Sequence, residues 1–217
     1  AAMKMESHKF QADFNPATDA MFKALVPHMK QPMKFLFKHR NLFKPIILLA
    51  MVKSPDTAAT VRTTSVMTMA QGSSAPNVLA QVAKVNINCR IVPGDTIERV
   101  KARIETRVGP KIQVSLANGT QPTDICRSDI PQFDLIKKAV TTVYPDLKVI
   151  APYLMVAATD SRVYHGMAEA VYRVEPFASS KDDRHTVHAD NERLKIDSFL
   201  KGIDLFKIIL KEGSKAT

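Results

Sequence analysis

The chain has 217 residues, of which 45% are hydrophobic and 24% are charged. This balance is typical of a folded protein with a buried core and excludes a disordered chain. Lys and Arg outnumber Asp and Glu by 31 to 21, which gives a net charge of +10. The apolar run 46–52 is far shorter than the roughly 18 residues that a membrane-spanning helix needs, and residues 1–8 lack the apolar core of a secretion signal.

The basic surplus raises the question of nucleic-acid binding. Its charges are scattered, for example at Lys30, Lys34 and Lys38, and aromatic residues are not interleaved with them as in single-strand binders. We therefore expect no nucleic-acid partner and no membrane partner. The sequence does not identify the cellular compartment, although the lack of a visible secretion signal favours the cytoplasm. Cys89 and Cys126 fit no zinc ribbon or CxxC motif, and we expect both to be reduced thiols.

Residues 10–52 are predicted to form short helices, because four prolines interrupt an otherwise helical and apolar pattern. Residues 60–69 are dense in Thr, Val and Met, which predicts a strand. Residues 71–76 predict a turn. Residues 84–91 alternate between apolar and polar side chains, which predicts a strand with one face on a core.

Asp95 and Glu98 have the spacing of a capping box at the start of a helix. The helix is predicted over 97–108, with Ile, Val, Ile and Val on one stripe, and a short strand follows over 111–116. Two strands, a helix and a strand in under sixty residues predict a small α+β layer of sheet and helix.

The last part of the chain favours an α/β layer. Pro131 follows Asp129 at the start of a predicted helix, and the apolar run 149–158 predicts a strand that is covered on both sides. A further short strand is predicted over 172–174. Asp197 is expected to cap a final helix whose buried stripe contains Phe199, Leu200, Ile203, Phe206, Ile209 and Leu210.

Polar side chains follow the predicted strand 149–158, among them Thr159 and Arg162. The ends of buried strands are where α/β proteins place their sites. The same pattern also fits a loop that only caps a helix.

Residues 184–192 contain two histidines, an amide and several acids, and include His188. Histidine is a frequent metal ligand, but a zinc site needs at least three protein ligands. The pattern alone therefore also fits a solvated loop.

Asn77 and Arg90 could meet across the predicted hairpin. Arg90 has the planar fork that binds a carboxylate, although an arginine on a half-exposed sheet is also commonly solvated.

Several of these motifs in this order resemble the zinc-dependent aminoacylase/carboxypeptidase family, and most of all its carboxypeptidase S-like branch. The motifs are 60–64, 77–79, 85–96, 159–162, 172–173 and 188–192. The resemblance implies a hydrolase that cleaves an amide or peptide bond next to a free carboxylate, acting on a small peptide or an N-acyl amino acid. It also implies two zinc ions in the complete enzyme and a homodimer formed through a ferredoxin-like lid.

The resemblance assigns residues 1–118 to a partial lid or dimerisation domain with an N-terminal helical stretch, and 119–217 to the C-terminal segment of an α/β catalytic domain. It implies that His188 is a metal ligand. It makes Asn77, Arg90, Thr159 and Arg162 substrate-binding residues. No catalytic residue is expected in this chain.

The chain departs from the family pattern in having Ala189 where a glycine is usual. The family's other zinc ligands precede the lid, and nothing before Phe10 supplies them. We therefore expect the C-terminal portion of such an enzyme, without bound zinc and inactive alone. The alternative is a non-catalytic dimerisation or interaction module derived from the family.

Overall fold

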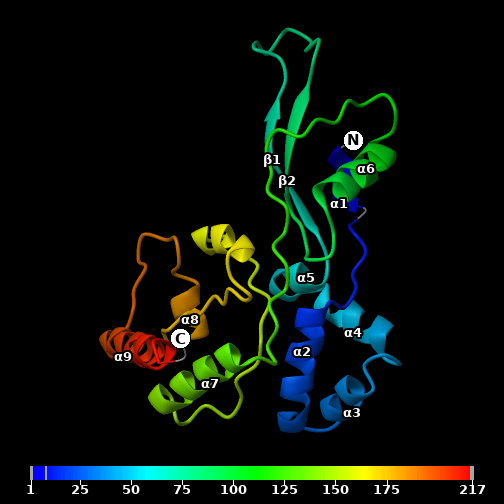
Figure 1. The fold of residues 1–217 in the computed structure, drawn as a ribbon. Helices are drawn as coiled ribbons and strands as arrows, with labels where there is room; N and C mark the ends of the chain where they lie inside the picture. The colour runs from blue at the N-terminus through cyan, green and yellow to red at the C-terminus, as the bar shows by residue number, and fades with distance from the viewer. Residues whose placement is uncertain (1, 8, 216–217) are drawn as a thin grey trace. The chain divides into compact units, whose positions relative to one another are not determined.

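The computed structural model describes residues 2–7 and 9–215 (Figure 1). The chain forms the following elements: α1 (Ala2–Ser7), α2 (Pro16–Leu25), η1 (Val26–His28), α3 (Met33–Lys38), α4 (Lys44–Met51), α5 (Pro55–Val61), β1 (Thr64–Gln71), β2 (Lys84–Arg90), α6 (Ile97–Val108), α7 (Pro131–Val143), η2 (Asp160–Gly166), α8 (Lys181–Arg184) and α9 (Ile196–Gly213). It divides into a first unit, Ala1–Ile125 with Pro152–Arg162, and a second unit, Cys126–Ala151 with Val163–Thr217. Helices with a small sheet give the chain a mixed α+β character.

β1 and β2 form an antiparallel ribbon in the first unit. Its register runs from Thr64 opposite Arg90 to Gln71 opposite Lys84. The predicted second strand is confirmed, whereas the predicted first strand begins too early, because Thr60 still belongs to α5. The Thr60 carbonyl accepts a hydrogen bond from Asn15 Nδ2 at 2.7 Å and does not pair with another strand.

One hydrophobic cluster of the first unit lies between α6 and the ribbon, next to α1 (Figure 1). Its buried members are Met5, Phe10, Val100, Ile104 and Val108. The predicted stripe of α6 therefore forms part of a core. Burial also raises the pKa of the Cys89 thiol, which packs against this cluster. Both cysteines are free, as expected.

The predicted strand 111–116 is wrong. These residues lie outside regular secondary structure, although Val114 still packs against the cluster on α6. A strand requires a hydrogen-bonded neighbour, and β1 and β2 pair with each other alone within the described chain.

A second hydrophobic cluster joins the helices of residues 10–61, which confirms the interrupted helical stretch. Its buried members are Phe22, Ile47, Met51 and Val61. Asn15 and Thr18 form a reciprocal capping box at the start of α2. Pro16 stands in the first turn, where the missing N–H costs no hydrogen bond.

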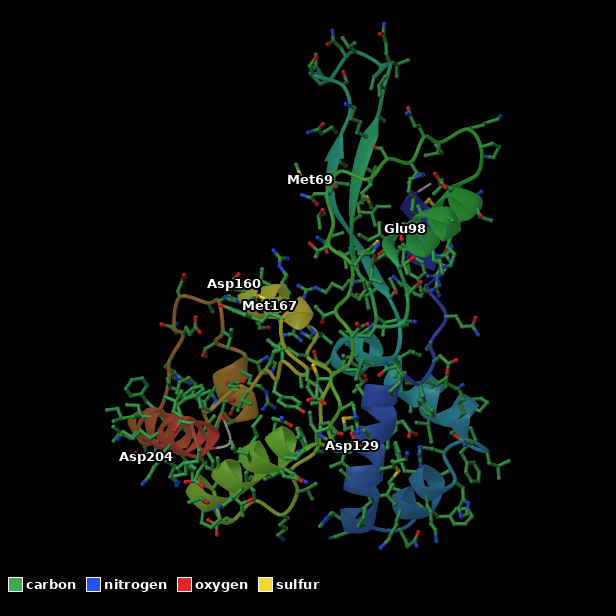
Figure 2. The ribbon with its side chains drawn as sticks, in the orientation of Figure 1. Met69, Glu98, Asp129, Asp160, Met167 and Asp204 are labelled. Carbon is green, nitrogen blue, oxygen red and sulfur yellow. The ribbon has the colours of Figure 1, made fainter. Side chains whose placement is uncertain are left out.

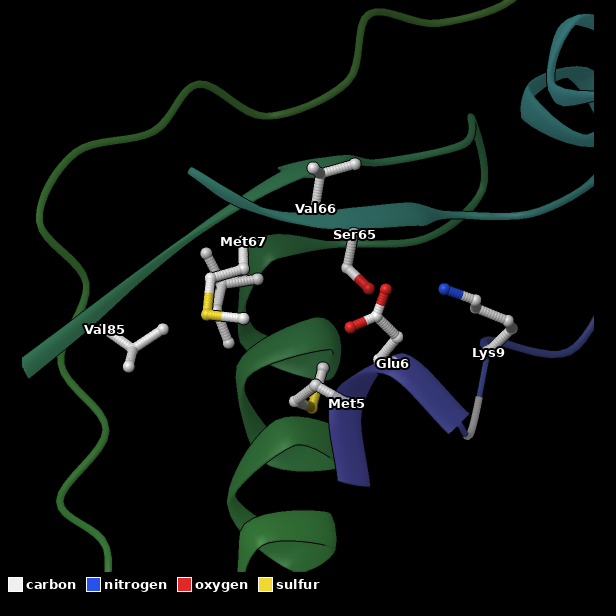
Figure 3. Close-up of a pocket in the computed structure, with 8 residues that line it drawn as sticks. Met5, Glu6, Lys9, Ser65, Val66, Met67 and Val85 are labelled. Carbon is white, nitrogen blue, oxygen red and sulfur yellow. The ribbon is translucent and has the colours of Figure 1, made fainter. Parts of the chain in front are cut away.

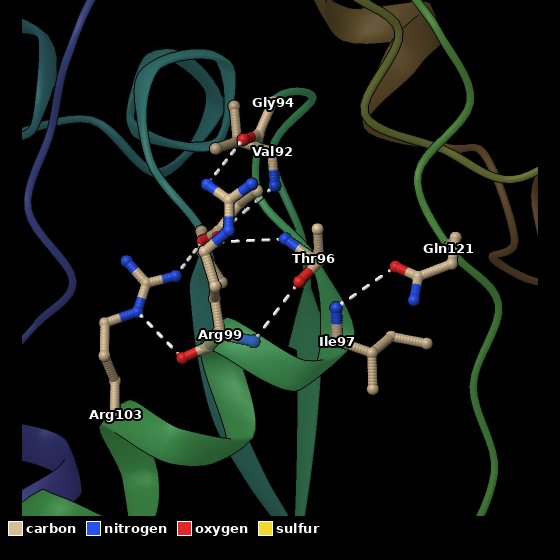
Figure 4. A network of polar contacts seen from close by, with 9 residues as sticks. Val92, Gly94, Thr96, Ile97, Arg99, Arg103 and Gln121 are labelled. Carbon is tan, nitrogen blue, oxygen red and sulfur yellow. Dashed lines mark hydrogen bonds and ion pairs between the residues drawn. The ribbon is translucent and has the colours of Figure 1, made fainter.

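The start of α6 differs from the predicted capping box (Figure 4). Thr96 is the N-cap, and its Oγ1 accepts from the Arg99 N–H at 3.2 Å. Asp95 instead accepts from the hydroxyl of Thr63 at 3.1 Å and forms an ion pair with Arg103. Asp95 therefore ties the residue before β1 to the loop before α6.

Acidification is expected to weaken the contacts of Asp95. Burial acts to raise the pKa of this carboxyl, but Arg103, the Thr96 N–H and Thr63 outweigh it and lower the pKa. A carboxyl with a lowered folded-state pKa stabilises the protein above its ordinary pKa, and this stabilisation is lost as the pH falls through the folded-state value. We expect Asp95→Asn to reduce the free energy of unfolding by about 2 kcal/mol at neutral pH, and by much less in acid.

Urea unfolding at several pH values measures this difference. Glu105→Gln is the matched control, because Glu105 forms an exposed pair with Lys101 on the same helix and is expected to cost about 0.5 kcal/mol. A pH-independent difference for Asp95→Asn would contradict the expectation.

The second unit contains α7 packed against α9. The predicted helix after Asp129 is confirmed, and Ala139 of α7 is fully buried. The predicted buried stripe of α9 is wrong: its buried residues are Ser198, Gly202 and Leu205. Phe199, Leu200, Ile203, Phe206 and Leu210 are 39–71% exposed. Small side chains at 198 and 202 allow the segment 176–178 to approach the helix closely, with Ser198 donating to the Ala178 carbonyl at 2.9 Å.

The predicted strands 149–158 and 172–174 are also wrong. Both segments lie outside regular structure, and the first includes Tyr153, which is 61% exposed. Their apolar composition fits a buried strand, but no neighbouring strand pairs with them in the described chain. None of the described helices is long and apolar enough to cross a membrane.

Candidate functional site

Arg90 connects the ribbon to the segment that precedes Thr159. It is the last residue of β2, and its Nη1 donates to the carbonyl oxygen of Val156 at 2.7 Å. Arg90 is exposed and makes no ion pair within the described residues. One side of the guanidinium is therefore fixed by a neutral acceptor, which leaves its positive charge available to an anion.

Thr159 directly precedes η2 and Arg162 lies in its first turn, both in the same unit as Arg90. Figure 2 marks this turn by Asp160. The Thr159 hydroxyl accepts from the Ser161 N–H at 3.2 Å, so it organises the turn. Arg162 Nη1 donates to the Thr120 hydroxyl at 3.5 Å. Sequence reasoning missed Val156 and Thr120, because no local signal links residues that are 66 and 42 positions away from these arginines.

Asn77 lies away from Arg90, and the expectation that the two meet across the hairpin is wrong. Asn77 follows Gln71 in the loop that joins the strands, whereas Arg90 pairs with Thr64 at the other end of the ribbon. Arg90 and Lys84 are six positions apart along β2, and at about 3.3 Å per position the two ends are about 20 Å apart.

His188 lies in the second unit and has an unusual backbone. Its φ is 64°, in the left-handed region that non-glycine residues seldom adopt. The His188 N–H donates to Glu192 Oε2 at 3.2 Å, which closes the turn. The imidazole is exposed.

The described residues do not provide a zinc site. Nowhere in 2–7 and 9–215 do three His, Cys, Asp or Glu side chains gather so that they could hold a metal ion. A structural or catalytic zinc ion takes at least three protein ligands. His188 with Glu192 beside it therefore does not fit zinc on its own.

A pocket of about 230 Å³ lies between α1 and the ribbon (Figure 3). It is lined by Met5, Glu6, Lys9, Ser65, Val66, Met67, Val85 and Ile87. The lining is mostly apolar and contains none of the predicted site residues.

A family model described as a peptidase dimerisation domain matches residues 17–113. The matched region contains α2 to α6 with the β1–β2 ribbon. This match and the relatives below agree with the resemblance to the zinc-dependent aminoacylase/carboxypeptidase family.

The chain is 28% identical to a probable carboxypeptidase S-like protein of Dictyostelium discoideum, over 85% of this chain and 36% of the relative. It is 28% identical to an N-fatty-acyl-amino acid synthase/hydrolase of Mus musculus, over 82% of this chain and 36% of the relative. A protein of the same name from Danio rerio is 30% identical over 99% of this chain and 42% of the relative. The chain thus spans about two fifths or less of the length of these relatives. No solved structure matches it at comparable significance.

Proposed function

We propose that the chain is part of a zinc-dependent hydrolase that cleaves an amide or peptide bond next to a free carboxylate, either a carboxypeptidase or an N-acyl amino acid hydrolase. The observation that carries the proposal is the bond from Arg90 to Val156, which joins the ribbon to the segment that leads into the Thr159–Arg162 loop, within one unit. Two arginines beside one loop provide the positive charge that a carboxylate-bearing substrate needs.

Residues 1–118 then act as a partial ferredoxin-like lid, and 119–217 contribute the C-terminal segment of the catalytic α/β domain. The match to a peptidase dimerisation domain supports a homodimer formed through this lid. The ribbon supports the same assignment, because each of its strands has an unpaired edge within the described chain, and such edges are ready to pair with another chain. Asn77, in the exposed loop of the ribbon, is assigned to the substrate side of the lid.

His188 is assigned as a metal ligand. Its left-handed backbone supports this role, because strained residues cluster at functional sites. The remaining zinc ligands must come from the part of the relatives that this chain does not match, so we expect the chain alone to hold no stoichiometric zinc. Metal analysis after dialysis measures this expectation.

The second candidate is a non-catalytic dimerisation or interaction module derived from the same family. The match of a peptidase dimerisation domain to residues 17–113 supports it. Such a module keeps the lid and needs no metal.

A chimera separates the two candidates. The chain replaces the matched region of the Danio rerio relative, which is 42% of that protein. A hydrolase fragment is expected to give zinc-dependent release of an amino acid from an N-acyl amino acid, and a chelator is expected to abolish it. In the chimera His188→Asn is expected to lower both the zinc content and the rate, since Asn tolerates the left-handed backbone but lacks the imidazole.

The parent relative is the positive control for the assay. A folded and zinc-loaded chimera without activity would favour the interaction module. Zinc content that is indifferent to His188→Asn would remove His188 from the metal site.

A further inference from the structure

The positive charge of the chain is concentrated in one stretch. Between Asp19 and Asp56 there is no acidic residue. The same stretch contains the cationic residues Lys23, Lys30, Lys34, Lys38, Arg40, Lys44 and Lys53. These seven charges make up most of the net charge of +10. The charges look scattered in the sequence, but the structure places them on α2, α3, α4 and the short connections of one helical group.

Nearby acids balance only part of this charge. Asp19 pairs with Lys23 at 3.0 Å and with Arg40 at 2.6 Å. Asp13 pairs with Lys44. Among the described residues no ion pair engages Lys30, Lys34, Lys38 or Lys53; of these, Lys34 donates to the carbonyl of Pro27.

Large apolar side chains are exposed on the same helices. Met33, Phe35, Leu42, Ile46 and Leu49 are 48–77% exposed. On α4, Ile46 and Leu49 share one face at helical spacing, while Ile47 and Met51 on the other face are buried in the second cluster. Lys53 follows in the turn after α4 and is exposed.

A ring contact links α3 to the residue that precedes α4. The ring of Phe35 contacts that of Phe43, directly before α4, with centroids 5.8 Å apart. We call the exposed residues Lys30, Met33, Phe35, Lys38, Leu42, Ile46, Leu49 and Lys53 the α3–α4 surface. It combines apolar side chains with unpaired cations on short helices.

We propose that the α3–α4 surface docks on an anionic lipid surface. Helices that lie in the membrane interface bury an apolar face among the acyl chains and place Lys side chains among anionic headgroups. α4 has eight residues, which is far too short to span a bilayer but suits binding parallel to the interface. Single-stranded nucleic acids are bound by cations together with stacking aromatics, whereas the exposed apolar side chains here are mostly aliphatic. This inference is independent of the proposed catalytic function.

Vesicle flotation with the full chain tests the proposal. Vesicles contain phosphatidylcholine and phosphatidylserine in equal amounts, or phosphatidylcholine alone. We expect binding to the anionic vesicles and little binding to the neutral ones. Changing Lys30, Lys38 and Lys53 together to Gln is expected to weaken binding about 100-fold, since each lysine near an anionic surface contributes roughly fivefold. Ile46→Asp with Leu49→Asp is expected to abolish binding.

Matched variants control for net charge and for general hydrophobicity. Lys84, Lys111 and Lys148, changed together to Gln, remove the same charge from exposed positions elsewhere. Leu200→Asp with Leu210→Asp change two exposed leucines of α9. Both sets are expected to bind as the unmodified chain does, and circular dichroism shows whether every variant is folded.

Three results would overturn the proposal. The first is failure of the folded chain to bind anionic vesicles. If such a chain instead binds an RNA duplex, and this binding is lost when the same three lysines are changed, the surface is a nucleic-acid surface. The second is equal loss of binding in the control variants. The third is a dimer that Ile46→Asp with Leu49→Asp dissociates while vesicle binding persists, because the surface then belongs to a second copy of the chain.

Discussion

Leu205→Ala is expected to lower the free energy of unfolding of the second unit by about 3 kcal/mol. Leu205 is 1% exposed and belongs to α9, the helix that packs against α7. Truncation of a buried leucine removes its transfer free energy and leaves a cavity, which together cost about 2–5 kcal/mol. Urea unfolding followed by circular dichroism measures the change.

Leu210→Ala is the matched control on the same helix. Leu210 is 71% exposed, so the same substitution is expected to change the free energy of unfolding by no more than about 0.5 kcal/mol. Similar losses for the two variants would show that the stripe predicted from the sequence, rather than the observed face, is buried in solution.

Arg90→Ala in the chimera is expected to lower kcat/KM for an N-acyl amino acid by about 100-fold. This prediction rests on the proposed function. Loss of a charged partner from a carboxylate costs about 2–5 kcal/mol where the pair is shielded from water, and a loss of about 2.7 kcal/mol corresponds to this factor. Steady-state kinetics with an N-acyl amino acid gives the value.

A substrate without the carboxylate separates binding from structure. With the corresponding N-acyl amino acid amide, Arg90→Ala is expected to equal the unmodified chimera, because no anion is present to bind. Equal losses on the two substrates would mean that Arg90 acts through its bond to the Val156 carbonyl. Arg90→Lys is expected to recover part of the rate, since lysine keeps the charge without the planar fork.

Sequence patterns predicted the elements whose conformation depends on nearby residues in the chain. Alternation of apolar and polar residues predicted β2, and the stripe of Val100, Ile104 and Val108 predicted the buried face of α6. In both elements the apolar side chains are the ones that pack. The interrupted helices of residues 10–52 were predictable for a similar reason, since proline acts on its own backbone.

Sequence patterns gave wrong predictions where contacts with residues distant in the chain determine the structure. Hydrophobicity marked the stripe of α9 that contains Phe199, but packing selected the small residues Ser198 and Gly202, which permit closer approach. The run 149–158 has the composition of a strand and lacks a paired neighbour in the described chain. Asp95 has the spacing of a helix cap but pairs with Arg103, two turns further along.

For the candidate site, the sequence pointed to residues but not to their neighbours. Arg90, Thr159 and Asn77 all belong to one unit. Asn77 lies in the loop at the opposite end of the ribbon from Arg90. The contact between Arg90 and Val156 depends on how two distant segments fold, which spacing along the chain cannot reveal.

The left-handed backbone of His188 has a consequence for how this position tolerates change. Most L-amino acids lose roughly 1–2 kcal/mol in that conformation, and glycine and asparagine lose least. In a saturation library of the chimera, selection for abundance is therefore expected to enrich Gly and Asn at position 188, and selection for turnover is expected to enrich His. If His ranks low in the abundance screen and high in the turnover screen, the imidazole is needed for activity although the backbone conformation at this position destabilises it.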